Sequence, residues 1–371
     1  MRKLIPSLAA GLLLLFSGSA KAQEVSTGAA ACLLMDADSG RVLLSHNADT
    51  PLPMASTTKV MTALLAIELG NMDAPVTCSK NAYGVPGTSI YLSLGETLTL
   101  REMLYGLMLC SGNDAAVAIA EHIGGSAEEF CRMMTARAKE LGCTNTVFLT
   151  PHGLPMEGHY TTARDLAIIA RHAMTLPLFR EIVSTSRATI PWEGRAYPRV
   201  LTNKNRLLTD YPGCTGIKTG YTKKAGRCLV FGARRDDMEV IGVVLNCYDW
   251  FDEAARLMNR AFENYTHVTM GLKGDCLRTV PVEKGTIPEV PALLGKDLSG
   301  VISSGAVPQV CIHLPESLSA PLHEGDVIGT ACLMEGDEAI AEVPLCCGAD
   351  VLEDDYAARW HLYWDNWLAV P

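Results

Sequence analysis

The sequence pattern changes at about residue 265, and this change limits the folds that the 371-residue chain can adopt. Residues 266–352 contain short runs in which apolar and polar residues alternate, broken by glycine and proline, and no run has long helical periodicity. Alternation of this kind is typical of β-strands with one buried face. We therefore predict a small all-β C-terminal domain at 266–352, preceded by a separate domain at 23–265.

The first of these domains is predicted to place helices between two β-rich segments. Residues 29–46 have the pattern of a β-hairpin, and a later strand at 227–235 is expected to pair with 239–246. Between these segments apolar residues recur at helical spacing, and capping boxes that begin at Thr99 and Ser126 mark helix starts. We expect an α+β (α/β) fold in which helices cover an antiparallel sheet.

The first 22 residues have the pattern of a cleaved secretory signal. Arg2 and Lys3 form a basic start, which is followed by an apolar run from Leu8 to Phe16 and by Ala20-Lys21-Ala22, a typical cleavage site. The apolar run is too short for a permanent transmembrane helix. We expect an exported, extracytoplasmic protein at the cell wall or at the outer face of the cytoplasmic membrane.

Acidic residues outnumber basic ones. Without the signal, 28 Lys and Arg residues remain against 41 Asp and Glu residues, and no basic stripe occurs along the chain. Binding to nucleic acid requires such a stripe. We therefore expect no nucleic-acid partner.

Thirteen cysteines in an exported chain would ordinarily suggest disulfides. Here the number is odd, no Cys-x-x-Cys occurs, and several cysteines lie within apolar runs, for example Cys32, Cys228 and Cys247. We predict free and mostly buried thiols, as in a bacterium from a reducing or anaerobic habitat.

Residues 353–371 form a tail in which aromatic residues follow one helical stripe. Tyr356, Trp360, Trp364 and Trp367 make this stripe, and such stripes suit a membrane interface. The same tail is acidic, so it lacks the basic face that anionic lipids attract. Two hypotheses stay open: an amphipathic helix at a membrane surface, or a short helix packed on the β-domain.

Ser56 and Lys59 are the first candidates for chemistry. Apolar residues recur at helical spacing from Val60 to Leu69 and Pro53 precedes them, so Ser56 lies in or near the first helical turn. Residues three apart share a helix face, which places the Lys59 amine beside the Ser56 hydroxyl. A serine becomes a nucleophile when a base takes its proton, and a buried lysine near another cation can act as that base. The alternative is a helix N-cap serine with a surface lysine one turn later.

Two further motifs follow the only Ser-x-x-Lys of the chain. Ser111–Asn113 (Ser-Gly-Asn) lies on a loop between two predicted helices, and Lys218–Gly220 (Lys-Thr-Gly) lies on a predicted strand. Each of these motifs is a weak signal by itself. The three in this order supply the groups that an acyl-transfer reaction needs.

We assign roles to these residues from their chemistry. Ser56 is the predicted nucleophile and Lys59 its base, while Ser111 is expected to pass a proton to the leaving group with help from Lys218. The backbone N–H groups of Ser56 and Tyr221 are the predicted oxyanion hole. The predicted substrate-binding residues are Asn113 for substrate amides, Lys218 and Thr219 for a substrate carboxylate, and Gly220 for close approach of the substrate backbone.

The motif set resembles that of the serine β-lactamases and penicillin-binding proteins. Further segments extend the resemblance, over nearly the whole chain, to the D-alanyl-D-alanine carboxypeptidases among the low-molecular-mass penicillin-binding proteins (peptidase S11 family): 109–115, 151–154, 159–165, 211–222 and 320–325. The resemblance implies a β-lactamase/transpeptidase-like catalytic domain, a β-rich second domain and a membrane-anchoring C-terminal helix. It also implies that peptidoglycan pentapeptide stems acylate Ser56 and release the terminal D-alanine, that β-lactams acylate the same residue, and that no cofactor takes part.

The two alternative functions are a serine β-lactamase and a non-catalytic wall-binding scaffold. A serine β-lactamase would form the same acyl-enzyme and hydrolyse it fast, but the Glu-x-x-x-Asn type of motif that class A enzymes use for this step does not occur around Glu157. A non-catalytic wall-binding scaffold would have no need to keep Ser56, Lys59, Ser111 and Lys218.

His152 and His159 are not expected to bind a metal, because no His-x-x-x-His helix or acidic partner accompanies them. We expect them to shape a loop below the site. Arg164 and Asp165 have the pattern of an ion pair at a helix start.

Overall fold

The computed structural model describes residues 23–354. These residues divide into two compact units, one of 23–267 with Val301–Gly305 and one of Val268–Gly300 with 306–354. The predicted signal at 1–22 lies outside the described residues, and so does the predicted tail from residue 355 onward.

The first unit is built on a six-stranded sheet in the order β1-β3-β2-β10-β9-β8. Its strands pair antiparallel, except for β1 with β3. The strands are β1 (Gln23–Glu24), β2 (Ala29–Asp36), β3 (Val42–His46), β8 (Cys214–Thr222), β9 (Gly226–Arg235) and β10 (Met238–Cys247). The β2–β3 hairpin and the β9–β10 pair confirm the two predicted strand pairs. Strand β8, which carries the Lys-Thr-Gly motif, lies at the edge of the sheet and has one side free of strand partners.

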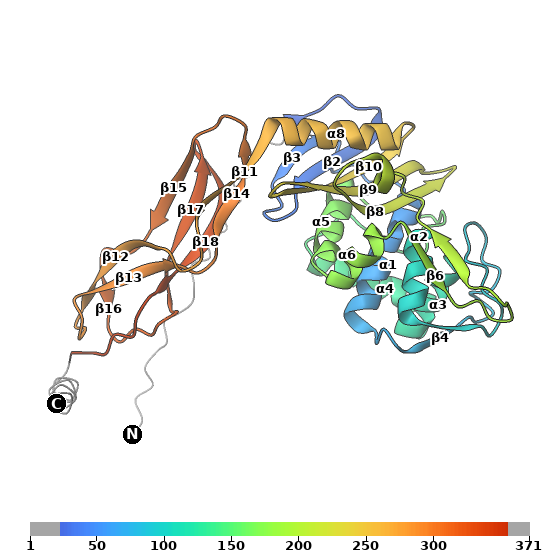
Figure 1. The fold of residues 1–371 in the computed structure, drawn as a ribbon, viewed down its shortest axis with the longest axis horizontal. Coiled ribbons are helices and arrows are strands. Elements are labelled where there is room, and N and C mark those ends of the chain that lie inside the picture. The colour runs from blue at the N-terminus through green and yellow to red at the C-terminus, as the bar shows by residue number, and fades with distance from the viewer. Residues whose placement is uncertain (1–22, 355–371) are drawn as a thin grey trace, which may run out of the picture. The chain divides into compact units, whose positions relative to one another are not determined.

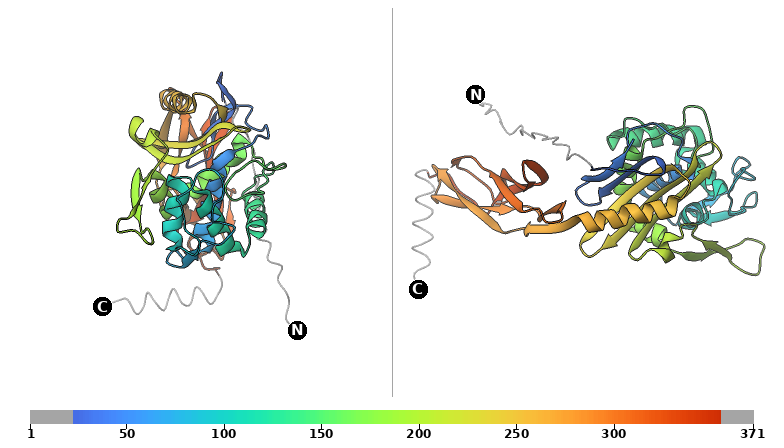
Figure 2. Two further views of the ribbon diagram at one scale, coloured as in Figure 1. Left: turned by 90° about the vertical axis from the view of Figure 1, so that its right-hand side faces the viewer. Right: turned by 90° about the horizontal axis from the view of Figure 1, so that it is seen from above.

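Helices cover both faces of this sheet (Figure 1). Successive residues of a strand face opposite sides, and in β2 Leu34 packs into a cluster with α8 (Trp250–Asn264), whereas Leu33 packs into the larger cluster with α1 (Lys59–Leu69). The left view of Figure 2 shows α8 and the other helices of this unit on opposite sides of the sheet. The predicted α+β fold, an antiparallel sheet covered by helices, is confirmed.

Helix α1 lies at the centre of the larger cluster. All its residues from Lys59 to Ala66 are buried, which is typical of a helix surrounded by protein on every side. The surrounding helices are α2 (Leu100–Leu109), α3 (Asn113–Gly124), α4 (Ala127–Glu140), α5 (Ala163–Met174) and α6 (Pro177–Ser184). Within the described ranges, no helix combines the length and apolar character needed to cross a bilayer.

The two predicted capping boxes have different outcomes. Thr99 and Glu102 form the complete box at the start of α2. At α4 the Ser126 hydroxyl accepts from the backbone N–H of Glu129, as predicted, but the Glu129 carboxylate pairs with Arg132. The second box is therefore only half formed, because a guanidinium one turn along the helix competes for the carboxylate.

The predicted Arg164–Asp165 ion pair is wrong. Arg164 pairs with Asp49 at 2.7 Å, whereas the buried Asp165 carboxylate accepts from Asn145 N at 2.8 Å and from Thr146 Oγ1 at 2.7 Å. Adjacent residues of a helix point in different directions, so each side chain reaches a different neighbour.

Two short hairpins were not expected. β4 (Pro75–Thr77) pairs with β5 (Thr97–Thr99), and β6 (Arg187–Ile190) pairs with β7 (Arg199–Thr202). The first hairpin encloses most of residues 71–93, a polar segment with glycine and proline for which the sequence predicts a long surface connection at the rim of the site. Part of this segment is in the core instead, since Ile90 and Leu92 are only 2% and 3% exposed.

The second unit consists of strands, which confirms the predicted all-β domain. Its six-stranded sheet has the order β15-β17-β18-β13-β12-β16. The strands are β12 (Cys276–Glu283), β13 (Glu289–Leu294), β15 (Pro308–His313), β16 (Leu318–Ser319), β17 (Val327–Glu335) and β18 (Glu338–Cys347). A two-stranded sheet pairs β11 (Tyr265–Gly271) with β14 (Leu298–Ser303), and a boundary between the two units falls within each of these strands.

All thirteen cysteines are free thiols, and eight of them are buried. Burial raises the pKa of Cys32, Cys131, Cys143 and Cys228 to about 12. These side chains therefore stay protonated and pack as small apolar groups.

Candidate active site

Ser56 lies on a short 3-10 turn, η1 (Ala55–Thr58), which runs directly into α1. The turn begins with a hydrogen bond from Thr57 N to Met54 O, so the Ser56 N–H precedes it and is not used by the turn. Edge strand β8 passes close by, because a Cβ added to Gly220 would lie 2.9 Å from Ser56 N. Only glycine at position 220 allows this approach. The structure thus brings the Ser-x-x-Lys and Lys-Thr-Gly motifs together.

Lys59 is the centre of the hydrogen-bond network at this point. Its fully buried Nζ lies 3.1 Å from Ser56 Oγ, 2.8 Å from Asn113 Oδ1 and 2.7 Å from His152 O. An amide oxygen and a backbone carbonyl can only accept, so the Lys59 amine must donate to Asn113 and His152. The Ser56 hydroxyl is the one partner that can also donate.

The surroundings of Lys59 favour its neutral form. Burial and, to a smaller extent, the positive charges of Lys218 and Lys204 lower the pKa of Lys59 well below its ordinary value, while Asp114 acts in the opposite direction. A neutral amine has two N–H groups and one lone pair. The two N–H groups match the two obligate acceptors, and the lone pair is left for the Ser56 hydroxyl.

Ser111 lies on the loop between α2 and α3 with φ +62°, a conformation that residues with a Cβ rarely adopt. Ser111 is 3% exposed, and its Oγ has no hydrogen-bond partner among residues 23–354. Buried hydroxyls are nearly always hydrogen-bonded. A buried, unpaired hydroxyl beside the reacting groups is available to accept and donate a proton.

Asn113 is the first residue of α3 and is held at both ends of its amide. Its Oδ1 accepts from Lys59, and its Nδ2 donates to Pro86 O at 2.7 Å. One N–H of the amide is left over. Asn113 therefore holds Lys59 and still has one donor for a substrate carbonyl.

Lys218, Thr219 and Gly220 lie in succession on β8. Lys218 is 1% exposed, and its Nζ donates to Thr219 O at 3.0 Å. Burial, with a smaller effect of Lys204, lowers the pKa of Lys218 to about 7. Tyr221, the residue of the second predicted oxyanion N–H, follows directly on the same strand.

Six of the predicted site residues line a cavity of about 340 Å³: Ser56, Ser111, Asn113, Thr219, Gly220 and Tyr221. Six residues without a predicted catalytic or binding role also line it: Gly87, Thr88, Leu154, Lys204, Thr222 and Trp250. Lys204 is the most informative of them, because it is a cation with a pKa lowered by burial, and no carboxylate pairs with it in the described part of the chain. The sequence marks Lys204 with no motif. A larger cavity of about 560 Å³ lies at the β6–β7 hairpin, beside Trp192 and Tyr197, and contains none of the motif residues.

His159 supports the turn that carries Ser56. Its Nδ1 accepts from Leu149 N at 2.9 Å, so Nε2 carries the proton and donates to Thr58 Oγ1 at 2.9 Å. The Thr58 hydroxyl in turn donates to Ala55 O at 2.8 Å. Between residues 23 and 354, no group of three or more His, Cys, Asp or Glu side chains is placed to hold a metal ion.

We expect the protein to lose stability as the pH falls from about 6.5 towards 4. Burial lowers the pKa of His159 from 6.5 to about 4, and burial is also the main reason that the pKa of His152 falls to about 3. In this window the unfolded chain binds protons that the folded chain cannot, so protonation favours unfolding. The measurement is the melting temperature as a function of pH.

The control for this prediction is His122→Gln, an exposed histidine of the same unit. His159→Gln should flatten the acid side of the stability profile, while His122→Gln should leave its slope as in the wild type. Equal slopes in the wild type and His159→Gln would contradict the prediction.

The fold and the site together indicate an enzyme class. A serine at a helix start, a buried lysine amine on its hydroxyl and a Lys-Thr-Gly edge strand beside it are typical of the serine acyl-transfer enzymes that include β-lactamases and penicillin-binding proteins. Comparison with known proteins narrows this class to one family.

Residues 18–248 match the peptidase S11 D-alanyl-D-alanine carboxypeptidase family, and residues 265–353 match the penicillin-binding protein 5 C-terminal domain. The D-alanyl-D-alanine carboxypeptidase DacF of Bacillus subtilis (strain 168) is 34% identical over 95% of this chain and 95% of its own. The D-alanyl-D-alanine carboxypeptidase DacC of Escherichia coli (strain K12) is 33% identical over 99% of this chain and 98% of its own. The crystal structure of penicillin-binding protein 5 from Haemophilus influenzae superposes with a TM-score of 0.78 at 30% identity, covering 89% of this chain and 99% of that one.

The chain therefore belongs to the peptidase S11 family of D-alanyl-D-alanine carboxypeptidases. The predicted family and the predicted serine carboxypeptidase activity are confirmed. Enzymes of this family act on peptidoglycan peptides and bind β-lactams, so their action is extracytoplasmic.

Proposed function

We propose that this protein removes the terminal D-alanine from peptidoglycan pentapeptide stems through an acyl-enzyme on Ser56, and that β-lactams acylate the same residue. The observation that carries the proposal is the position of Lys59 Nζ, in contact with Ser56 Oγ and with two obligate acceptors. In its neutral form the Lys59 amine uses its two N–H groups for Asn113 Oδ1 and His152 O, so its lone pair is left to accept the proton of Ser56. The reaction would take place in residues 23–265, with 266–352 as an appended domain.

Acylation follows from this arrangement. Ser56 Oγ attacks the carbonyl carbon of the penultimate D-alanine, and its proton passes to Lys59 Nζ. The N–H groups of Ser56 and Tyr221 stabilise the oxyanion that forms. The C–N bond to the terminal D-alanine then breaks, and the leaving amine takes up the proton through Ser111, assisted by Lys218.

Deacylation reverses the roles with water in place of the amine. Water attacks the ester carbon, Lys59 takes its proton, and the C–O bond to Ser56 breaks as the proton returns to Ser56 Oγ. The products are the shortened stem and free D-alanine.

We assign recognition of the substrate carboxylate to Thr219, Lys218 and, in addition, Lys204. Lys218 is fully inside the protein and already donates to Thr219 O. Lys204 has no such partner in the described residues and lines the same cavity. A substrate carboxylate would supply the missing anion.

Lys204→Ala is expected to raise the KM of substrates with a free C-terminal carboxylate about tenfold or more, since a hydrogen bond to a charged group contributes about 1.5–3 kcal/mol. Acylation by an amide-capped substrate should change less, and Lys218→Ala should show the same selectivity. Steady-state kinetics on the two substrates measure the difference between the effects of each substitution. Lys224→Ala, an exposed lysine at the β8–β9 turn, serves as the matched control. Equal losses on both substrates would argue against the assignment.

The reaction itself is tested by D-alanine release from a synthetic acyl-Lys-D-Ala-D-Ala, with penicillin in a parallel sample. We expect release that penicillin blocks, together with a covalent penicilloyl mass increase on the protein. A stable penicilloyl adduct without release would indicate a transpeptidase that lacks its acceptor. The absence of both D-alanine release and the penicilloyl adduct would favour the scaffold hypothesis.

We further propose that the protein is exported to the outer face of the cytoplasmic membrane, with the aromatic stripe of 353–371 at the membrane surface. The pattern of the first 22 residues and the four aromatic residues of the stripe support this location. The excess of Asp and Glu over Lys and Arg supports the absence of a nucleic-acid partner. Sedimentation with lipid vesicles, comparing the full chain with one ending at residue 352, tests the role of the tail.

A further inference from the structure

We infer that Asp114 is a positioning residue for acyl transfer: its buried carboxylate folds the loop 86–92, and this loop fixes the orientation of the Asn113 amide beside Lys59. The inference rests on the proposed function and adds to it a residue that lies outside the three motifs. Asp114 does not line the cavity and acts only through its neighbours.

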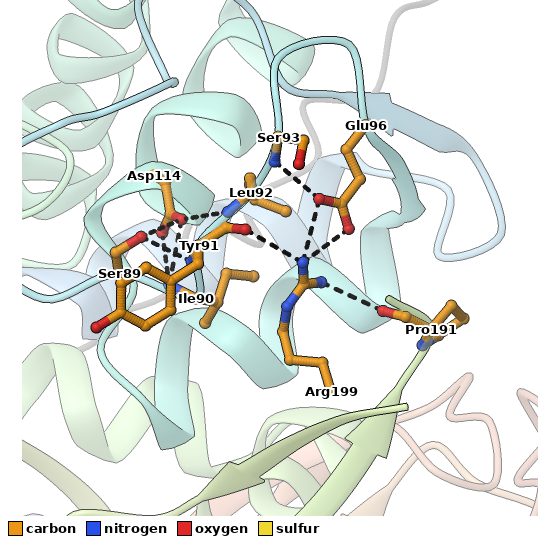
Figure 3. Close-up of polar contacts among 9 residues, drawn as sticks. All are labelled: Ser89, Ile90, Tyr91, Leu92, Ser93, Glu96, Asp114, Pro191 and Arg199. Carbon is orange, nitrogen blue, oxygen red and sulfur yellow. Dashed lines mark hydrogen bonds and ion pairs between the residues drawn. The ribbon is translucent and has the colours of Figure 1, made fainter. Parts of the chain in front are cut away.

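The Asp114 carboxylate is the point about which the loop folds (Figure 3). Asp114 is 1% exposed and accepts from Ser89 Oγ at 2.6 Å and from Ile90 N and Leu92 N at 3.1 Å. It also accepts from Ala115 N in the first turn of α3. Charge-assisted bonds to backbone N–H groups and a helix N-terminus stabilise a buried carboxylate without a cation. The same bonds hold three successive parts of the loop against α3.

A buried ion pair fixes the far end of the loop. Arg199 of β7 and Glu96 lie 2.8 Å apart, and both are almost fully buried. Arg199 also donates to Tyr91 O at 3.3 Å, and the Glu96 carboxylate accepts from Ser93 N at 2.8 Å (Figure 3). The loop is therefore held at both ends and cannot shift as a whole without breaking buried bonds.

The loop reaches the active site through Asn113. Pro86 O accepts from Asn113 Nδ2, and Thr88 O accepts from Asn113 N, both at 2.7 Å. The Thr88 hydroxyl donates to Ser111 O at 2.5 Å. Gly87, with φ +97°, lets the loop come so close that a Cβ at this position would lie 2.8 Å from Asn113 Nδ2.

The orientation of the Asn113 amide decides what Lys59 can do. Because Pro86 O can only accept, Nδ2 must face the loop and Oδ1 must face Lys59. A reversed amide would present N–H groups to the Lys59 amine and remove one of its two obligate acceptors. The Asp114 carboxylate holds the loop in position, and the loop in turn keeps the Lys59 amine aligned with Ser56 through the Asn113 amide.

The test is Asp114→Asn, with Asp165→Asn as the matched control. Asp165 is also a buried carboxylate in the first turn of a helix, and it also binds a loop through a backbone N–H and a hydroxyl, but the two residues it binds there, Asn145 and Thr146, do not line the cavity. The readouts are the rate of acylation by a fluorescent penicillin as a function of pH and the folded fraction. We expect Asp114→Asn to slow acylation about tenfold or more, since a displacement of ~1 Å can cost a hundredfold. Asp165→Asn should acylate like the wild type when the rate is scaled to folded protein.

The pH profile distinguishes positioning from general loosening. The positive charges of Lys218 on β8 and of Lys204 before α7 (Leu207–Asp210) lower the pKa of Lys59, and Asp114 is the acidic group that raises it. Loss of the Asp114 charge, or reversal of the Asn113 amide, lowers the pKa of Lys59 further, so the acidic limb of the acylation rate should move to lower pH. Entry of water around a loosened Lys59 would move the limb to higher pH and would overturn the inference.

Ser89→Ala provides a second variant if Asp114→Asn does not fold. It removes one of the bonds to the carboxylate and keeps the charge, so we expect slower acylation with an unchanged pH limb. Acylation by both variants as fast as by Asp165→Asn would overturn the inference. A wild-type protein that penicillin does not acylate would instead overturn the proposed function, so the two failures are distinguishable.

Discussion

Ser56→Ala is expected to abolish both covalent labelling by penicillin and release of D-alanine. The substitution removes the oxygen that forms the acyl-enzyme, and loss of the nucleophile in serine peptidases lowers kcat by on the order of 10⁶-fold. Ser56 makes one side-chain hydrogen bond within the described residues, to Lys59 Nζ, so folding should hardly change. Mass spectrometry after incubation with penicillin and an assay for free D-alanine measure the two losses.

Ser126→Ala is the matched control for this prediction. Ser126 is the N-cap of α4 and accepts from Glu129 N, so its loss should cost about 1 kcal/mol of stability and leave labelling intact. The two serine-to-alanine variants should therefore give opposite patterns. Labelling of Ser56→Ala at the wild-type rate would remove Ser56 from its assigned role.

Lys59→Met is expected to slow acylation by about 10²–10⁴-fold, the usual contribution of a general base. Methionine nearly fills the volume of the lysine stem but has no amine to take the Ser56 proton. The change also leaves Asn113 Oδ1 and His152 O without their donor, and each unpaired buried acceptor costs about 1–3 kcal/mol. Acylation rates and melting temperatures must therefore be measured together.

Thr62→Val separates the two effects of Lys59→Met. Thr62 is a fully buried residue of the same helix, and its Oγ1 donates to Pro151 O at 2.6 Å. Its loss leaves a neighbouring carbonyl of the same loop unpaired and should destabilise the protein without slowing acylation of the folded fraction. A Lys59→Met protein that penicillin acylates within a factor of about ten of the wild type would contradict the role of Lys59 as base.

Short-range features of this protein could be predicted because their causes are local. The hairpin at 29–46, the capping box at Thr99 and the spacing of Ser56 and Lys59 depend on residues close together in the chain. Where two groups compete to pair with one charged side chain, the sequence does not show which of them forms the pair. The Glu129 carboxylate paired with Arg132, and Arg164 reached Asp49 instead of its neighbour.

The candidate site was predicted in its motifs but not in its surroundings. The structure brings Ser56, Ser111, Asn113 and Thr219 to one cavity, and their catalytic and binding roles stay predictions. Lys204 was missed because it has no periodic pattern or motif of its own, whereas the loop 86–92 lies in the segment 71–93 that was predicted as a surface connection at the rim of the site. The loop resembled a surface connection, since its polar residues find their partners in α3 and β7, far away in the sequence.

The sequence by itself determined the order of the elements, the two-part organisation and the residue types available for acyl transfer, because backbone propensity and hydrophobic periodicity act between near neighbours. Only the tertiary structure decided which acceptors surround Lys59, which way the Asn113 amide points and which carboxylate holds the loop beside it. Those contacts join residues tens of positions apart, and their free energy depends on burial and on the partners that packing brings within hydrogen-bond distance. The local rules supply a serine and a lysine on one helix turn. Packing buries that lysine and so lowers its pKa.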